Sequence, residues 1–281
     1  MSSLFIALQH ILPQHALSRL AGSLAASETP WLRDALIRRF ARAYGVDLSE
    51  AARGIGEFAS FNDFFTRELK PGVRPLADAG QFILSPADGA VSQLGPISGG
   101  RIIQAKGRDY SVAEILGCGA EEAARFEGGS FITVYLSPKD YHRVHMPAAG
   151  TLAATSYIPG DLYSVNVATA AGVDRLFARN ERLACRFDGP DGNFASIMVG
   201  AMIVAGIDTV WPNRFRTHAH APVHEDFAGQ GRSFAAGDEM GRFYLGSTVV
   251  LLFEPGRVTW REDLKAGDPL RMGEAIAQRL G

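Results

Sequence analysis

From about Phe61 to the end of the chain, glycine and proline interrupt the sequence at short intervals, with short apolar runs between them. Runs rich in valine, isoleucine and phenylalanine predict β-strands, most clearly at Phe131–Leu136, Ser196–Val204 and Thr248–Phe253. Strands and helices do not alternate along this region as they would in a parallel α/β protein. The sequence therefore predicts a mainly antiparallel β core.

The beginning of the chain has the period of amphipathic helices instead. Apolar residues recur at three- and four-residue spacing on either side of Pro13, at Leu4, Leu8, Ile11, Leu12, Leu17, Leu20 and Leu24. A second helix is expected over Leu32 to Tyr44. The predicted fold class is α+β, with N-terminal amphipathic helices in residues 1–60 and a β-sandwich or barrel-like core in residues 61–281.

Charge separates the two regions. The chain carries 28 basic and 30 acidic residues, a formal −2, whereas residues 1–45 hold five arginines against Glu28 and Asp34. A balanced total makes nucleic acid an unexpected partner. An apolar stripe beside a basic helix suits the surface of an anionic bilayer. The alternative is that these helices only cap the protein core, and pattern alone leaves both interpretations open.

No signal peptide is recognisable at the N-terminus, and no uncharged apolar run reaches the roughly 18–20 residues that would span a bilayer. The two cysteines, Cys118 and Cys185, are too few for a secreted disulfide scaffold and favour two buried thiols in a reducing compartment.

The segments Ala236–Gly241 (AGDEMG) and Ala266–Gly273 (AGDPLRMG) are similar, which indicates a duplicated β motif.

Three places in the β region carry side chains suited to catalysis. Ser247 follows Gly246 directly before a predicted strand, so its hydroxyl could attack a carbonyl that glycine leaves unshielded. His142 and His145, beside Tyr141, are suited to proton transfer near neutral pH. Asp88 lies in a turn and could orient a histidine.

Each of these features also has a purely structural interpretation. A Gly–Ser pair at a strand end is usually a tight turn, an aspartate before glycine is ordinary turn chemistry, and two histidines can be hydrogen-bonded parts of a core. A competing metal site is formed by His218, His220 and His224, with Glu225 or Asp226 as a further ligand. The sequence lacks an HExxH helix and a paired-cysteine motif, so no metal is expected.

Eight strings occur together in order along most of the chain. They are FNDFFTRELKPGVRP (61–75), SPADGAV (85–91), AKG (105–107), LSPKDYHRVHMP (136–147), GDLYSVN (160–166), FARNERL (177–183), VGAMI (199–203) and EMGRFYLGSTVVLLF (239–253). In combination they resemble the phosphatidylserine decarboxylase family, and LGST is the form associated with its bacterial members. The first 45 residues are less distinctive.

The resemblance implies roles for particular residues. Asp88 of PADG, His145 as the second histidine of YHRVHMP, and Ser247 of LGST match the family's catalytic triad. His142 matches a histidine implicated in decarboxylation and substrate contact, and Tyr141 is a candidate substrate neighbour.

The resemblance also implies a mechanism. The precursor would cut itself between Gly246 and Ser247 into a β chain (1–246) and an α chain (247–281) that remain associated, with a homodimer of that pair as one arrangement the family allows. Ser247 would become a pyruvoyl group that forms a Schiff base with phosphatidylserine and releases CO2, giving phosphatidylethanolamine, without metal or pyridoxal phosphate. The expected location is peripheral, on the cytoplasmic face of the cell membrane.

Two rival functions remain at this point. A pyruvoyl decarboxylase for a small soluble amino acid would need no amphipathic N-terminus and would be indifferent to liposomes. A non-enzymatic β module that binds lipid or metal through its histidines would leave Gly246–Ser247 uncut.

Overall fold

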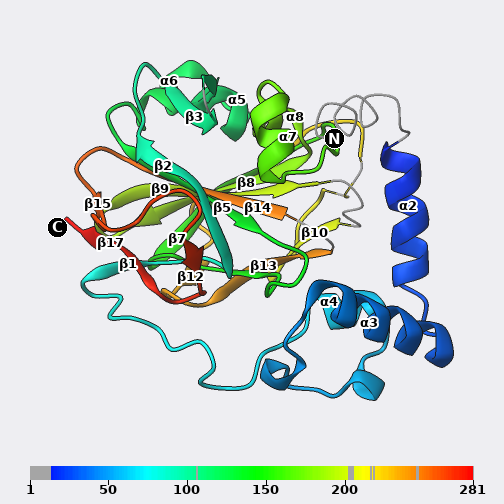
Figure 1. Cartoon of the computed structure of the whole chain (residues 1–281). Coiled ribbons are helices and arrows are strands. Elements are labelled where there is room, and N and C mark those ends of the chain that lie inside the picture. The colour runs from blue at the N-terminus through cyan, green and yellow to red at the C-terminus, as the bar shows by residue number, and fades with distance from the viewer. Residues whose placement is uncertain are drawn as a thin grey trace.

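The computed structural model describes residues 14–280 except 106, 202–205, 216, 218 and 245–246. Among these residues the central feature is a nine-stranded antiparallel sheet (Figure 1). Its strands, in sheet order, are β11 (Val223–Asp226), β7 (Gly150–Ile158), β8 (Arg182–Gly189), β9 (Gly192–Gly200), β14 (Ser247–Phe253), β5 (Ser130–Leu136), β2 (Gly89–Pro96) and β16 (Pro269–Leu270), with β12 (Ser233–Phe234) also paired to β7.

Three small antiparallel sheets complete the β region. The first consists of β1 (Phe82–Leu84), β17 (Ala275–Arg279) and β15 (Val258–Trp260). The second consists of β10 (Gly206–Thr209), β13 (Glu239–Tyr244) and β6 (Arg143–His145). The third consists of β3 (Arg101–Ala105) and β4 (Arg108–Ser111). All described strand pairs are antiparallel, which confirms the predicted β core. The large sheet ends on β11 and β16, so the described strands do not close into a barrel.

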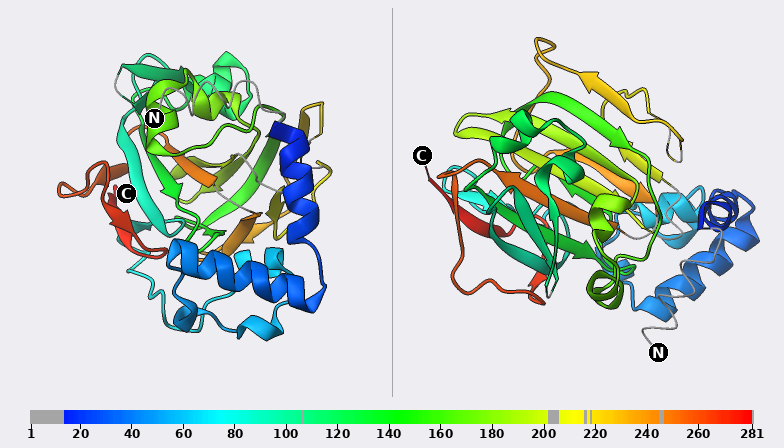
Figure 2. Two further views of the ribbon diagram at one scale, coloured as in Figure 1. Left: turned by 45° about the vertical axis from the view of Figure 1, so that its right-hand side comes forward. Right: turned by 90° about the horizontal axis from the view of Figure 1, so that it is seen from above.

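The helices form two groups. The N-terminal group is α2 (Gln14–Ala25), α3 (Pro30–Tyr44), two 3-10 turns (Leu48–Glu50 and Ile55–Glu57) and α4 (Phe61–Phe65). The second group is α5 (Val112–Leu116), α6 (Ala120–Ala124), α7 (Val167–Gly172) and α8 (Leu176–Arg179). Figure 2 shows α2 and α3 to one side of the sheets, away from the C-terminus, while the second group covers a face of the large sheet.

Strand β14 is buried on both faces because two apolar clusters sandwich the large sheet. All seven of its residues are buried. Val249 and Leu251 belong to the cluster on one face, and Val250 and Leu252 belong to the cluster on the other, as the two-residue period of a strand requires. A strand buried on both sides has a continuous apolar sequence, and this explains why Thr248–Phe253 was recognisable.

The N-terminal helices have an aromatic core of their own. Phe40 of α3 makes edge contacts with Phe61, Phe64 and Phe65 of α4 at centroid distances of 5.1 to 6.3 Å. Phe58 joins the same cluster. The helical layer therefore extends through α4, a few residues past the boundary expected at residue 60.

Most predicted elements are confirmed. The strands Phe131–Leu136 and Thr248–Phe253 correspond to β5 and β14, and the helix expected from Leu32 corresponds to α3. The strand predicted at Ser196–Val204 starts earlier, at Gly192, and ends at Gly200. The helix expected over Leu4–Leu12 lies outside the described residues.

The two AGD segments form the same turn twice. Gly237 and Gly267 have positive φ angles of 86° and 96°, which glycine adopts without strain. The carboxylates of Asp238 and Asp268 each accept the backbone N–H of the residue three positions earlier, at 2.7 and 2.9 Å. The duplication suggested by the sequence is thus present in local structure, and one copy supplies a backbone carbonyl to the candidate site.

Candidate active site

Ser247 is the first residue of β14 and lies in the middle of the large sheet. It is paired with Leu136 of β5 on one side and with Gly200 of β9 on the other. Its side chain is fully buried, and its Oγ has no hydrogen-bond partner among the described residues. Gly246, the other half of the predicted cleavage site, lies outside the described residues.

An unpaired buried hydroxyl is costly. Leaving one without a partner costs about 1–3 kcal/mol, and most buried polar groups are therefore hydrogen-bonded. Ser247 and the next residue, Thr248, both have unpaired hydroxyls at the start of β14. The start of β14 therefore carries two adjacent polar groups whose burial is unfavourable for stability.

His145 is fixed in one tautomer by its surroundings. It lies on β6, opposite Glu239 of β13, and is 9 % exposed. Its Nδ1 is 2.8 Å from the carbonyl oxygen of Gly237, which can only accept, so Nδ1 carries the proton. Its Nε2 therefore has a free lone pair, which accepts the Tyr141 hydroxyl at 3.0 Å.

Burial keeps His145 neutral. It lowers the pKa of the imidazole, while the Gly237 carbonyl and the charges of Glu239 and Asp88 act in the opposite direction. The same burial raises the pKa of the Tyr141 hydroxyl. The pair is thus a neutral phenol donating to a neutral imidazole, an arrangement suited to general base catalysis.

His142 is the most deeply buried histidine described. Its Nδ1 donates to the carbonyl oxygen of Asp140 at 2.8 Å, and its ring lies against Phe65 at a centroid distance of 4.1 Å. Its Nε2 is buried without a described partner. Burial lowers the pKa of His142 to about 3, so the ring is neutral and Nε2 is an open acceptor.

Asp88 is held by an arginine. The Arg74 guanidinium donates to both of its carboxylate oxygens, with its Nε at 2.9 and 3.1 Å and one Nη at 2.5 Å. The backbone N–H of Met272 adds a bond of 2.9 Å. Arg74 also pairs with Glu50 of the helical region at 2.7 Å, so one cation joins that region to the candidate site.

The expected hydrogen bond between Asp88 and His145 is not what the structure shows. Among the described contacts, both ring nitrogens of His145 have other partners, and Arg74 occupies both oxygens of Asp88. The turn that carries Asp88 still lies beside His145, because the backbone N–H of His145 donates to the carbonyl oxygen of Pro86, in the same turn, at 2.8 Å. The carbonyl of Gly237 therefore sets the tautomer, while Asp88 acts on His145 through its charge.

Two cavities open beside these residues. The larger, about 540 Å³, is lined by Arg67, Arg74, Asp88 and Tyr141 together with neighbouring residues. The smaller, about 290 Å³, is lined by Arg74, Tyr141 and His145, among others. Tyr141 and Arg74 border both, so Asp88 and His145 face adjoining spaces.

Sequence reasoning assigned no role to Arg67 or Arg74, although both lie in the FNDFFTRELKPGVRP string. The one nearby feature was the aromatic run of α4, which ends two residues before Arg67. Nothing local indicated that Arg74 would pair with Asp88.

The competing metal site is only partly described, because His218 lies outside the described residues. Where the chain is described, no group of three or more His, Cys, Asp or Glu side chains is arranged to hold a metal ion. His224 instead bonds to the Ser156 hydroxyl at 2.9 Å through Nδ1. Cys118 and Cys185 are free thiols.

Comparison with known proteins identifies relatives over almost the whole chain. A family model described as phosphatidylserine decarboxylase matches residues 61–278, and a second model, described as PSD, matches residues 4–45. Similar curated proteins are named phosphatidylserine decarboxylase proenzyme. Those of Saccharophagus degradans, Chromobacterium violaceum and Pseudomonas aeruginosa are 55, 54 and 52% identical. The alignments cover 98% of this chain and 97, 98 and 96% of the respective relatives.

Replacing His142 by asparagine should flatten the dependence of folding stability on pH. Between pH 6.5 and about 3 the unfolded chain binds a proton on this ring and the folded chain does not, so the wild-type free energy of unfolding falls as the pH is lowered. The asparagine amide can retain the bond to Asp140 but does not titrate. Urea unfolding at several pH values from 7 to 4 gives the free energy of unfolding of each protein as a function of pH. The prediction would be contradicted if this free energy changed equally with pH in the wild type and the variant.

Proposed function

Because the chain belongs to the phosphatidylserine decarboxylase family, we propose that it is a self-cleaving, pyruvoyl-dependent enzyme that converts phosphatidylserine to phosphatidylethanolamine. The observation that carries the proposal is the buried, unpaired hydroxyl of Ser247 at the start of the central strand. The neutral histidines His142 and His145 follow closely after Leu136, the β5 partner of Ser247, and the carbonyl of His142 accepts the backbone N–H of Phe243, four residues before Ser247.

In the proposed self-cleavage, the Ser247 hydroxyl oxygen attacks the carbonyl carbon of Gly246. His145 takes the hydroxyl proton, directly or through the Tyr141 hydroxyl that already donates to its Nε2. The new C–O bond forms, the C–N bond breaks, and the released nitrogen takes up the proton, which leaves an ester. Loss of the α-proton of residue 247 then breaks the Cβ–O bond and frees residues 1–246.

The dehydroalanine left at position 247 adds water and loses ammonia, which yields a pyruvoyl group at the head of residues 247–281. The strand pairing supports continued association of the two chains. Within that fragment β14 pairs with β5 and β9, β16 pairs with β2, and β17 pairs with β1. All four partners lie in residues 1–246, so cutting one peptide bond leaves these ladders intact.

The pyruvoyl group supplies a carbonyl conjugated to an amide, an electron sink that no amino-acid side chain provides. His142 handles the accompanying proton in our proposal. After CO2 leaves, its Nε2 delivers a proton taken up from solvent to the α-carbon of the product, with His145 as the second candidate donor. Because burial disfavours the charged ring, the protonated His142 is a strong acid and gives the proton up readily.

Replacing Ser247 by alanine should abolish release of CO2 and formation of phosphatidylethanolamine from phosphatidylserine vesicles, measured by mass spectrometry. Ser196→Ala is the matched control, because Ser196 is also fully buried on the large sheet with an unpaired hydroxyl. This control should retain activity. Decarboxylation that persists in the Ser247 variant would refute the proposal, and equal turnover of free L-serine would favour the soluble-substrate rival.

We also propose that the N-terminal helices dock the enzyme on the cytoplasmic face of the membrane, where its lipid substrate lies. In α2 and at the start of α3, Leu20, Leu24 and Trp31 are 61, 50 and 73 % exposed. Arg38, Arg39 and Arg42 of α3 are exposed as well. Apolar side chains beside arginines suit an anionic interface. Among the described residues, no helix has the length and apolarity needed to cross a bilayer.

Trp31→Ser should weaken binding to vesicles of anionic phospholipid about tenfold, because the indole no longer enters the interface. Co-sedimentation with vesicles measures this. Ile103→Ser is the matched control: Ile103 is 53 % exposed on β3, at the opposite end of the molecule from α3 in Figure 1. Equal binding by the two variants would contradict docking through the N-terminal helices.

A further inference from the structure

Arg67 is a buried cation without an anion. It is only 3 % exposed, and no carboxylate among the described residues lies within ion-pair distance of it. One Nη donates to the carbonyl oxygens of Lys139 and Asp140 at 3.1 and 3.4 Å. Its Nε and the other Nη are buried with no described hydrogen-bond partner, and the only other described contact of the guanidinium is with the Phe64 ring, 5.4 Å from its centroid.

The two other arginines that are buried in the described part of the chain have partners for their donor nitrogens. Arg143 pairs with Glu68 and Glu239 at 3.1 and 2.8 Å. Arg182 has no described carboxylate partner, yet each of its three nitrogens donates to a backbone carbonyl at 2.5 to 2.9 Å. Arg67 differs from both in having two donor nitrogens left over. A buried charge in that state is strongly unfavourable unless a ligand supplies the missing partner.

The carboxylates whose charges act on Arg67 already have other hydrogen-bond partners. Asp88 and Glu50 both bind Arg74, and Asp140 accepts the backbone N–H of Ser137 at 2.7 Å. Burial lowers the pKa of Arg67, but a guanidinium stays charged at neutral pH.

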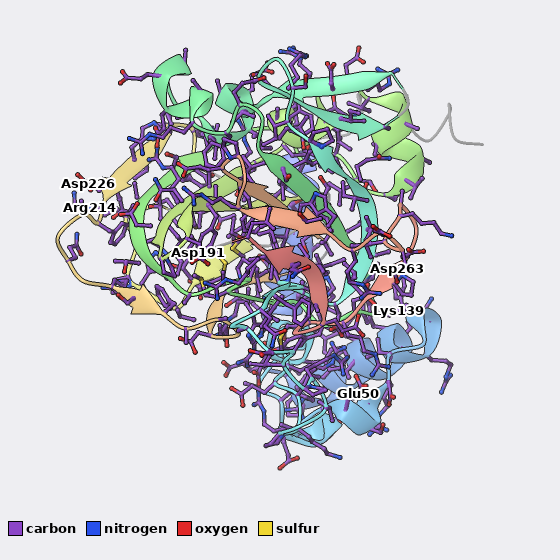
Figure 3. The ribbon with its side chains drawn as sticks, turned by 90° about the vertical axis from the view of Figure 1, so that its left-hand side faces the viewer. Glu50, Lys139, Asp191, Arg214, Asp226 and Asp263 are labelled. Atoms are coloured by element: carbon purple, nitrogen blue, oxygen red, sulfur yellow. The ribbon has the colours of Figure 1, made fainter. Side chains whose placement is uncertain are left out.

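Arg67 borders the larger cavity close to His142. The cavity, about 540 Å³, is also lined by Glu50 and Lys139, whose labels mark one side of the molecule in Figure 3. The Asp140 carbonyl oxygen accepts both from Arg67 and from Nδ1 of His142. The shared carbonyl places the Arg67 guanidinium beside His142, so a headgroup held by Arg67 would lie close to the ring that handles the proton in our proposal.

We propose that Arg67 binds the phosphodiester of the phospholipid headgroup, an assignment that rests on the proposed function. The substrate has two anionic groups, and they differ in their fate. The carboxylate loses its charge in the reaction, so an arginine on it would stabilise the ground state more than the transition state. The phosphodiester keeps its charge from substrate to product, and its oxygens match the fork of a guanidinium.

The test compares wild-type enzyme with Arg67→Met and Arg67→Lys. Binding is measured by 31P NMR titration with glycerophosphoglycerol, a phosphodiester without amine or carboxylate. Loss of a charge-assisted pair should weaken this binding about 10- to 100-fold in Arg67→Met, with a smaller loss in Arg67→Lys because the charge remains. The KM for phosphatidylserine in mixed micelles should rise in parallel, with a smaller change in kcat.

Two controls sharpen the result. Arg214→Met removes an arginine whose side chain is 87 % exposed and whose label lies far from Glu50 and Lys139 in Figure 3, so binding should not change. O-methyl-L-serine, which has the carboxylate and amine but no phosphate, is titrated through its own 1H signals and should bind wild type and both variants alike. If Arg67→Met fails to fold, the binding of glycerophosphoglycerol by Arg67→Lys is compared with that of the wild type instead.

Unchanged binding of glycerophosphoglycerol in a folded Arg67 variant would overturn the assignment. Weaker binding of O-methyl-L-serine alone would overturn it as well, because the carboxylate would then be the ligand. Failure of the proposed function has a separate signature: wild-type enzyme would release no CO2 from phosphatidylserine, whatever the phosphodiester titration gives.

Discussion

The arrangement of this molecule depends on β14, a strand paired along both edges and buried on both faces. Its apolar residues join the two clusters on either side of the large sheet. Ser247 at its first position is therefore surrounded by protein and deprived of water. Removing a hydroxyl from water without pairing it is unfavourable, and the surrounding packing sustains that cost. Such a site suits a reaction that occurs once, within the folded chain, and whose proposed ester must not be hydrolysed before elimination frees residues 1–246.

Arg67 and Arg74 connect the N-terminal helical region to the candidate active site in different ways. Arg74 is saturated, since it pairs with Glu50 and with both oxygens of Asp88, and it thereby ties the helical layer to the turn beside His145. Arg67 is unsaturated and borders a cavity near His142. The first arrangement is complete without a ligand and has a positioning role. Arg67 has no anionic partner among the described residues, and for this reason we assign it to substrate binding.

Sequence reasoning succeeded where the signal is local. The apolar run at Thr248–Phe253 and the helical period from Leu32 reflect burial of neighbouring residues, and both elements are present. It failed where partners are distant: Gly237, which holds the His145 ring, is 92 positions away, so Asp88 was expected in that role instead. The packing of Phe40 on Phe61 likewise joins residues of different helices and has no local signal in the sequence.

The central claim is that the buried Ser247 is where the chain cuts itself, and the intact mass of the purified protein under denaturing conditions tests it most directly. The account predicts two species in place of the 30.2 kDa chain: residues 1–246, and a 247–281 peptide lighter by one ammonia than the product of simple hydrolysis. A single species of full mass in a protein that decarboxylates phosphatidylserine would contradict the account, because the electron sink would then have to come from elsewhere.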